Sequence, residues 1–334
     1  MRIVYAGSPA IAVPALEALV VLALESAERV PSSAAGVFEL AGVLSNPDSP
    51  RGRHGKPEPT ELAAAAAALG PRFEGAGLRP PVIMKPERLG AEARREIEAL
   101  GPDILVSFAY GKIFGPKFLA LFPLGGINIH PSLLPAYRGP TPIPQAILNR
   151  DRETGISIQR LALEMDSGDI LVQEAFPLAG TETAAGLAEE MARRAAALIP
   201  QVLRGMASGT LEGRPQDNEK ASYCRLLSRD DGRIDWGRGA LDIEAQVRAY
   251  NPWPLAWTLD GDQRLYIHKA LAGPEGEKEA APGTVLGIDR GRGILVQTGE
   301  GTLAAALLQY EARKALDWRA FLNGARGFIG RRLR

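Results

Sequence analysis

The stretch Gly126-Ile127-Asn128-Ile129-His130-Pro131-Ser132-Leu133-Leu134-Pro135 decides how the rest of the chain is interpreted. Its first half alternates apolar and polar residues, which is the period of a β-strand. On such a strand Asn128 and His130 point to the same face, where the chain leaves the sheet. Ligands of open α/β sheets bind at the carboxyl ends of the strands. The stretch therefore predicts a strand that ends in a binding site.

A carboxylate follows in Met165-Asp166-Ser167-Gly168-Asp169, which we expect in the turn of a strand pair. An amide donor, an imidazole that titrates near neutral pH and a carboxylate together suit acyl transfer to an amine. Taken singly, an Asn or His at a strand end is more often a structural polar residue, and an Asp before Ser-Gly is usually a turn residue. The three residues in this order favour catalysis.

The composition is that of a soluble globular protein. The chain has 334 residues, enough for two domains, with 46% apolar and 23% charged residues and a net charge of zero. The neutral charge gives no indication of a nucleic-acid partner. A single cysteine, Cys224, excludes an internal disulfide and fits a reducing, cytoplasmic compartment. The three histidines lie too far apart in sequence to suggest a metal site, so we expect no metal.

The start of the chain favours a protein that neither enters nor crosses a membrane. The apolar stretch from Ala10 to Leu24 contains Pro14 and Glu17, so we expect no membrane span there. Because Arg2–Ala6 already has the pattern of a strand, no signal peptide is expected before it.

The first half of the chain alternates strand and helix patterns, which predicts a doubly wound, mostly parallel α/β sheet, Rossmann-like in class. Asp103–Ala109 is a continuous apolar run, as a strand buried on both faces requires. A helix is expected from Thr60, its N-cap, to Leu69. Gly7-Ser8-Pro9 lacks the Gly-x-Gly-x-x-Gly fingerprint, so a dinucleotide-dependent dehydrogenase is poorly supported.

The second half has a different pattern, with short strands separated by Gly-containing turns, which is typical of a small β-barrel, OB-like in class. We expect a catalytic domain over residues 1–206, a linker over 207–222 and the barrel domain over 223–334. A helix is expected from Ala240 to Tyr250. The expected strands are Ala256–Leu259, Arg264–Leu271, Gly283–Ile288, Ile294–Thr298 and Thr302–Leu308.

The chain resembles the methionyl-tRNA formyltransferases over nearly its whole length. Asn128-Ile129-His130, Ser132-Leu133-Leu134-Pro135 and Asp166-Ser167-Gly168-Asp169 resemble motifs of folate-dependent formyltransferases in general, glycinamide ribonucleotide formyltransferase included. The resemblance to the tRNA-specific family comes from Arg233-Ile234-Asp235-Trp236 and Ala249-Tyr250-Asn251-Pro252-Trp253-Pro254, which are similar to the start of that family's C-terminal domain. This chain departs from the family at Pro131, where Gly is usual, and in apparent insertions near Pro31 and Gly75.

The resemblance implies transfer of a formyl group from 10-formyltetrahydrofolate, a co-substrate, to the α-amine of initiator methionyl-tRNA. The motifs imply that Asn128, His130 and Asp166 are catalytic. Among the basic residues of the loop 46–59, Arg53 and Lys56 are the expected tRNA contacts. The protein would act as a monomer. The expected folate contacts are Ser132, Leu133, Leu134, Pro135, Ala109, Tyr110 and Gly111.

Two alternatives stay open from the sequence. The same chemistry could formylate a small amine, such as a glycinamide or amino-sugar nucleotide. The chain could instead be an RNA-binding protein with an inactive formyltransferase domain, although the complete set of Asn128, His130 and Asp166 argues against this. Trp253 and Trp257 could stack on bases, but the prolines on both sides of Trp253 favour a packing role for it.

Overall fold

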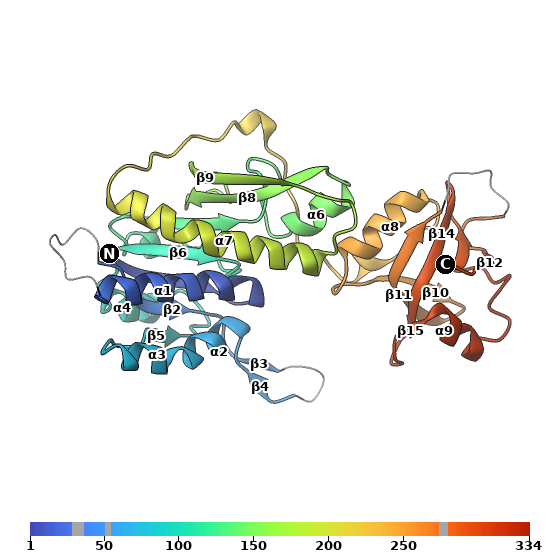
Figure 1. Cartoon of the computed structure of the whole chain (residues 1–334), viewed down its shortest axis with the longest axis horizontal. Coiled ribbons are helices and arrows are strands. Elements are labelled where there is room, and N and C mark those ends of the chain that lie inside the picture. Colours follow the sequence, from blue (N-terminus) through green and yellow to red (C-terminus); the bar gives the residue numbers. More distant parts are fainter. Residues whose placement is uncertain (29–36, 51–54, 274–279) are drawn as a thin grey trace. The chain divides into compact units, whose positions relative to one another are not determined.

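A computed structural model describes residues 1–28, 37–50, 55–273 and 280–334 of the chain (Figure 1). The chain separates into two compact units. The first contains Met1–Pro140, Thr154–Phe176 and Ala188–Tyr223, and the second contains Thr141–Glu153, Pro177–Leu187 and Cys224–Arg334. Each unit has its own sheet.

The sheet of the first unit is mostly parallel, which confirms the predicted fold class. Its strands are parallel from β5 to β7, and β8 runs antiparallel to β7. In spatial order they are β5 (Val82–Met84), β2 (Glu39–Leu44), β1 (Arg2–Gly7), β6 (Ile104–Phe108), β7 (Gly126–His130), β8 (Glu153–Arg160) and β9 (Ile170–Pro177).

Helices cover both faces of this sheet because its central strands are apolar on both sides. Val4 and Ala6 of β1 pack in one cluster with Ile97 of α4. Tyr5, between them, points to the other face and donates its hydroxyl to the carbonyl of Ala12. The helices named in this unit are α1 (Val13–Glu28), α2 (Glu61–Ala68), α3 (Gly70–Gly75), α4 (Ala91–Glu98), α5 (Pro116–Leu119) and α7 (Ala184–Ala207), and α7 begins in residues assigned to the second unit.

By length and composition alone, the segment Ala10–Glu28 is long and apolar enough to cross a membrane, a test that the core helix of a soluble protein also passes. Pro14 does not interrupt the helix because it lies in the first turn of α1, where the missing N–H is not needed. Leu16, Leu19 and Val20 are fully buried. This burial is that of a core helix packed on a sheet.

The chain order places the predicted site one strand away from a topological switch point, which lies between β1 and β6. From β1 the chain continues to β2 on one side, and it later returns to form β6 on the other side. Such an arrangement opens a crevice at the carboxyl ends of the strands. Asn128 and His130 lie at that end of β7, and Ala109 follows directly after β6.

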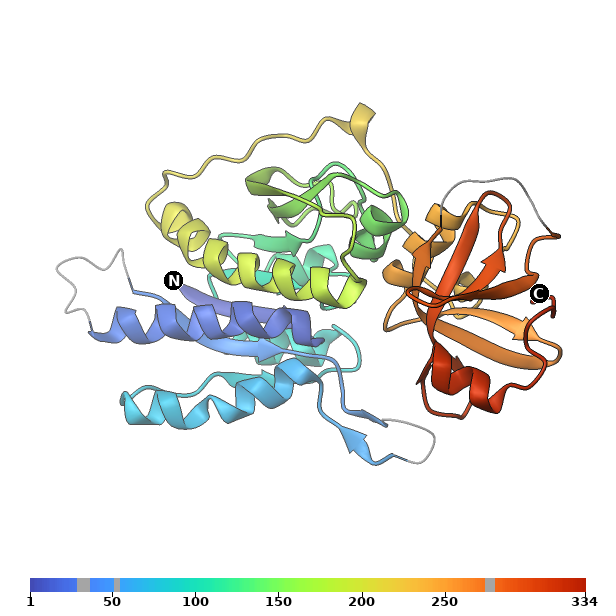
Figure 2. The same cartoon turned by 45° about the vertical axis from the view of Figure 1, so that its right-hand side comes forward.

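A hairpin leaves this same edge of the first unit. It consists of β3 (Ser49–Pro50) and β4 (Pro57–Glu58), which pair antiparallel and extend away from the main sheet (Figure 2). The N-cap predicted at Thr60 is confirmed, since its hydroxyl accepts a hydrogen bond from the amide of Ala63. Gly75 ends α3, whereas Pro31 lies outside the described residues.

The second unit is built on an antiparallel sheet that agrees with the predicted strands. The order is β10 (Ala256–Asp260), β11 (Gln263–Ala272), β14 (Thr302–Tyr310), β13 (Gly293–Gln297) and β12 (Val285–Asp289), with β15 (Leu316–Asp317) beside β14. The last residues hydrogen-bond to both edge strands, Arg334 to Leu259 of β10 and Arg331 to Val285 of β12. The helices are α6 (Pro142–Leu148), α8 (Ala240–Ala249) and α9 (Trp318–Gly324).

Candidate active site

The register of the sheet surrounds the Asn-x-His strand with polar neighbours. β7 runs beside β6 and β8, so its backbone is hydrogen-bonded on both sides. Asn128 stands opposite Gln159 of β8, and His130 stands opposite Ser157. Cross-strand partners on one face have Cβ atoms about 5 Å apart. Gln159 is thus next to Asn128 by register alone.

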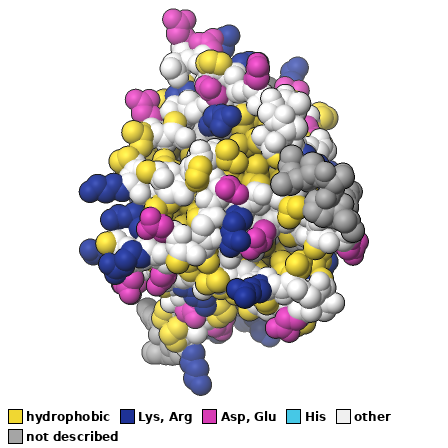
Figure 3. All heavy atoms as spheres, turned by 90° about the vertical axis from the view of Figure 1, so that its left-hand side faces the viewer, with side chains coloured by type: hydrophobic (Ala, Val, Ile, Leu, Met, Phe, Trp, Pro, Cys, Tyr) yellow, Lys and Arg dark blue, Asp and Glu magenta, His cyan; other side chains and the backbone are white. Residues whose placement is uncertain are grey.

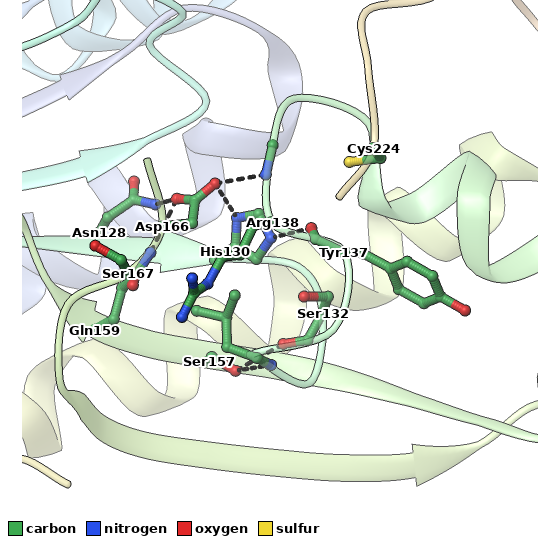
Figure 4. A network of polar contacts seen from close by, with 12 residues as sticks. Asn128, His130, Ser132, Tyr137, Arg138, Ser157, Gln159, Asp166, Ser167 and Cys224 are labelled. Atoms are coloured by element: carbon green, nitrogen blue, oxygen red, sulfur yellow. Dashed lines mark hydrogen bonds and ion pairs between the residues drawn. The ribbon is translucent and has the colours of Figure 1, made fainter. Parts of the chain in front are cut away.

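The three residues predicted to be catalytic come together. One carboxylate oxygen of Asp166 accepts hydrogen bonds from Asn128 Nδ2 at 3.3 Å and from Gln159 Nε2 at 2.9 Å. The other oxygen accepts from the amide of Gly139 at 2.8 Å and lies 3.6 Å from His130 Nδ1 (Figure 4). An amide, an imidazole and a carboxylate from two separate segments therefore share one site.

His130 is held as a buried, neutral imidazole. Its side chain is 5% exposed, and its Nε2 lies 2.9 Å from the carbonyl oxygen of Tyr137. Since a carbonyl only accepts, this contact assigns the proton to Nε2 and leaves Nδ1 facing Asp166. Burial lowers the pKa of His130 from its ordinary value, although the Asp166 charge and the Tyr137 carbonyl act in the opposite direction. A neutral imidazole is able to accept a proton.

The segment predicted to contact folate forms a rigid turn after β7. The Ser132 hydroxyl is buried and donates to the carbonyl of Ala136 at 2.6 Å. The Leu134 amide donates a hydrogen bond to Ser157 Oγ at 3.1 Å. The Leu134–Pro135 peptide bond is cis. The Ser132 hydroxyl and the Leu134 side chain are therefore buried and make their contacts within the protein.

The second group of predicted folate contacts lies at the end of β6. Ala109 and Gly111 are exposed and have positive φ angles of 53° and 81°, so the backbone turns sharply there. The Tyr110 ring is buried and stacks on Phe114, while its carbonyl accepts from Asn46 Nδ2 at 2.9 Å. Only backbone atoms of Tyr110 face the strand ends. This position agrees with backbone contacts to a ligand and leaves the ring in the core.

Pro131 fits its turn, which explains how the chain tolerates this departure from the family Gly. The Ser132 amide donates to the carbonyl of His130 at 2.9 Å, forming a three-residue turn centred on Pro131. The inverse form of this turn needs φ near −75°, which the proline ring imposes.

We expect Pro131→Gly to lower stability while activity is largely retained. Glycine adds freedom to the unfolded chain, which costs about 0.4–1 kcal/mol of unfolding free energy. Chemical denaturation of both proteins measures the difference. Equal or greater stability of the glycine variant would show that Pro131 is strained in the folded state.

A cavity of about 620 Å³ lies at the carboxyl ends of β1 and β2. Its walls come from the loop after β1, the loop after β2, the start of α2 and the loop after β6. The polar residues of its lining include Ser8, Asn46, Asp48, Thr60, Glu61 and Lys112. The β3–β4 hairpin contributes Ser49 to this lining. Lys56, an expected tRNA contact, is exposed just before β4, whereas Arg53 lies outside the described residues.

Three contributors to the site were not predicted from the sequence: Gln159, the Gly139 amide and Gln216. Gln159 could have been found, because Ile156-Ser157-Ile158-Gln159 alternates apolar and polar residues like a strand, and its pairing with β7 brings Gln159 beside Asn128. Gln216 had no local signal, since it falls in residues 207–222, predicted as a linker. Among the described residues no cluster of His, Cys, Asp or Glu is suited to a metal ion.

This fold and this site define an enzyme of the formyl transferase class. A family model described as formyl transferase matches residues 25–203, and one described as formyl transferase, C-terminal domain, matches residues 226–326. The chain belongs to the methionyl-tRNA formyltransferase family. It is 44% identical to the methionyl-tRNA formyltransferase of Treponema denticola over 333 residues, which is 98% of each chain. It is 41% identical to that of Chloroflexus aurantiacus over 97% of each chain.

Solved structures share the fold at low identity. A sugar 3N-formyl transferase, solved in the presence of dTDP and 5-N-formyl-THF, has a TM-score of 0.59 and 17% identity, covering 94% of this chain and 99% of its own. An N-formyltransferase from Helicobacter canadensis, in complex with folinic acid and dTDP-3-aminofucose, has a TM-score of 0.59 and 18% identity over 91% of this chain and 99% of its own.

Proposed function

We propose that the enzyme transfers the formyl group of 10-formyltetrahydrofolate to the α-amino group of initiator methionyl-tRNA. The observation that carries this proposal is the convergence of Asn128, His130 and Asp166 on one site at the carboxyl end of β7. The nearly full-length similarity to methionyl-tRNA formyltransferases supports the choice of acceptor.

The reaction requires one bond to form and one to break at the formyl carbon. The methionyl amine attacks this carbon, the carbonyl oxygen becomes an oxyanion, and the bond to the folate nitrogen breaks. A proton leaves the attacking nitrogen and another reaches the leaving nitrogen, so no charge is left over. Asn128 Nδ2 supplies a donor for the oxyanion, a contact worth about 10²–10³ in rate.

His130 takes the proton of the attacking amine and returns it to the folate nitrogen. The neutral imidazole has this capacity at neutral pH because burial lowers its pKa. Asp166 stabilises the imidazolium that forms, since its carboxylate faces Nδ1 at 3.6 Å. Gln159 and the Gly139 amide keep this carboxylate in place.

We assign the cavity at the carboxyl ends of β1 and β2 to the aminoacyl end of the tRNA, with the hairpin next to it. The face seen in Figure 3 has basic and acidic side chains interspersed, so it offers no field of one sign to a polyanion.

Lys56 on the hairpin is exposed and makes no contact that we observe among the described residues. It is therefore available to a phosphate.

The Lys56→Ala variant should raise KM for methionyl-tRNA and leave KM for folate unchanged. Losing one phosphate contact reduces the salt slope of binding by about 1. Kinetics at several salt concentrations, with the exposed Lys117→Ala as matched control, measure this. The same salt slope in both variants would remove Lys56 from the tRNA interface.

The second unit offers a surface that suits tRNA. Trp253 is 53% exposed and lines a cavity of about 320 Å³ with Arg229, Trp257 and Arg264. The guanidinium of Arg264 lies 4.2 Å from the centre of the Trp257 ring. Aromatic and arginine side chains bind bases and phosphates. We propose that residues 223–334 form the tRNA-binding domain and residues 1–206 the catalytic domain, joined by 207–222.

An acceptor assay tests the proposed function. The enzyme is incubated with 10-formyltetrahydrofolate and either methionyl-tRNA or glycinamide ribonucleotide, and formyl transfer is followed. We expect formylation of methionyl-tRNA only. We propose that the enzyme acts as a monomer and in the cytoplasm. Formylation of the small amine alone would contradict the proposed acceptor and support the second candidate, a small-amine formyltransferase.

A further inference from the structure

The segment that leads out of the first unit lies along the active site. The backbones of Arg214 and Ile170 exchange two hydrogen bonds, of 2.8 and 2.9 Å. Further along, the Ser222 amide donates to Pro135, and the Arg138 amide donates to the Ser222 carbonyl. Residues 214–222 thus connect the start of β9 with the loop that follows β7. Gln216 lies between these two attachments.

The Gln216 carboxamide joins the Asp166 loop, strand β8 and the loop that follows β7. Its Nε2 donates to the backbone carbonyls of Asp166 at 2.8 Å and Gly168 at 2.7 Å, and lies 3.1 Å from Gln159 Oε1. Its Oε1 accepts from Arg138 Nη2 at 2.8 Å and Nε at 3.1 Å. Both ends of the amide are used. Arg138 is buried, and its Nη2 also donates to Asn218 Oδ1 at 2.7 Å.

The Asp166 loop needs such support because its backbone is constrained. Asp166 has a φ of 53°, a left-handed conformation that non-glycine residues seldom adopt. Gly168 admits no other residue there, since a Cβ would lie 1.9 Å from the carbonyl oxygen of Arg160. A conformation of this kind persists only when the surroundings fix it. The two carbonyls that Gln216 holds lie at and just after Asp166.

We propose that Gln216 is a positioning residue for catalysis, which holds the Asp166 loop so that the carboxylate faces His130. It acts on the loop through the Asp166 and Gly168 carbonyls and on the same carboxylate through Gln159, which donates to Asp166 Oδ1. The inference rests on the proposed chemistry of Asp166 and His130 but not on the identity of the acceptor.

Two substitutions separate this role from a structural one. Gln216→Ala removes both ends of the amide, whereas Gln216→Glu keeps an acceptor for Arg138 and replaces the donor toward the two carbonyls. We expect both variants to lower kcat about 10–100-fold, the range for a misplaced catalytic group. KM for folate should stay within about twofold, because displacing the carboxylate affects the chemical step.

The pH profile supplies a readout that a general loss of stability would not move. Asp166 is the charged group that raises the pKa of His130. When the carboxylate is displaced, this pKa falls further, so the acid limb of kcat/KM should move to lower pH in Gln216→Ala. Gln216→Glu adds a negative charge of its own, so only its kcat is compared. Asn218→Ala is the matched control, because Asn218 contacts Arg138 but has no bond to the Asp166 loop that we observe. Its kcat and pH profile should match the wild type.

The experiment uses the full chain and whichever acceptor the wild type formylates, so failure of the tRNA assignment does not affect it. Thermal unfolding checks that each variant is folded. Wild-type kcat in Gln216→Glu would show that Arg138, and not the Asp166 loop, is what Gln216 serves. In Gln216→Ala, a lower kcat with an unmoved acid limb would likewise overturn the proposal.

Discussion

Replacing His130 by alanine should reduce kcat by about 10²–10⁴, the range for loss of a general acid–base group. The reason is that no other described side chain at the end of β7 combines a neutral nitrogen base with an adjacent carboxylate. Binding of methionyl-tRNA should change little, because the imidazole is buried and contacts Tyr137 and Asp166. Single-turnover formylation together with a tRNA binding assay measures both quantities.

His130→Gln and Ser157→Ala are useful comparisons for this prediction. Gln retains a polar side chain without a titratable nitrogen, so it should be as slow as alanine. Ser157 stands opposite His130 on β8, and its hydroxyl bonds to Ser132 and Leu134 in the turn after β7. Ser157→Ala therefore reports the effect of disturbing the surroundings of His130 while the imidazole stays. If tRNA binding in His130→Ala falls as much as kcat does, the residue has a structural role.

Asp166→Asn should reduce kcat by about 10²-fold and move the acid limb of kcat/KM to lower pH. The Asp166 carboxylate accepts hydrogen bonds from three donors. An asparagine side chain has one NH₂ group in place of an oxygen, so at that position two donors face each other. The sign of the pH shift follows from the charges. The carboxylate raises the pKa of His130, so its removal lowers that pKa and extends the neutral form to lower pH.

The pH dependence of kcat/KM for wild type and variant measures this shift. In the wild type the acid limb should lie below the ordinary histidine value of about 6.5, because the pKa of His130 is lowered by burial. An acid limb that moves to higher pH in Asp166→Asn would contradict the assignment of His130 as the titrating base.

Local patterns predicted those parts of the structure that depend on neighbours in sequence. The alternation Ile127-Asn128-Ile129-His130 predicted both the strand and the shared face, and the strands of the second unit agree with their predicted ranges to within a few residues. That Asp166 lies close to Asn128 and His130 could be predicted only because an expected strand pair and the resemblance to a family motif both pointed there.

Other parts of the site depend on contacts between distant segments, which periodicity does not encode. Gln216 lies 50 residues after Asp166 in a polar segment without a strand or helix pattern, so nothing in its surroundings indicated a role. Ser132 stays a predicted folate contact, and the turn that brings its hydroxyl within 2.6 Å of the Ala136 carbonyl could not be seen in the sequence. The role of Arg53, outside the described residues, stays a prediction.

The central claim is that His130 and Asp166 act as one unit at a single formyl carbon, and a double-mutant cycle tests it most directly. Single-turnover rates are measured for the wild type, His130→Ala, Asp166→Asn and the double variant. If the carboxylate acts through the imidazole, the double variant should be about as slow as His130→Ala alone. Rate losses that multiply, so that the double variant is slower by the product of both single effects, would contradict the account.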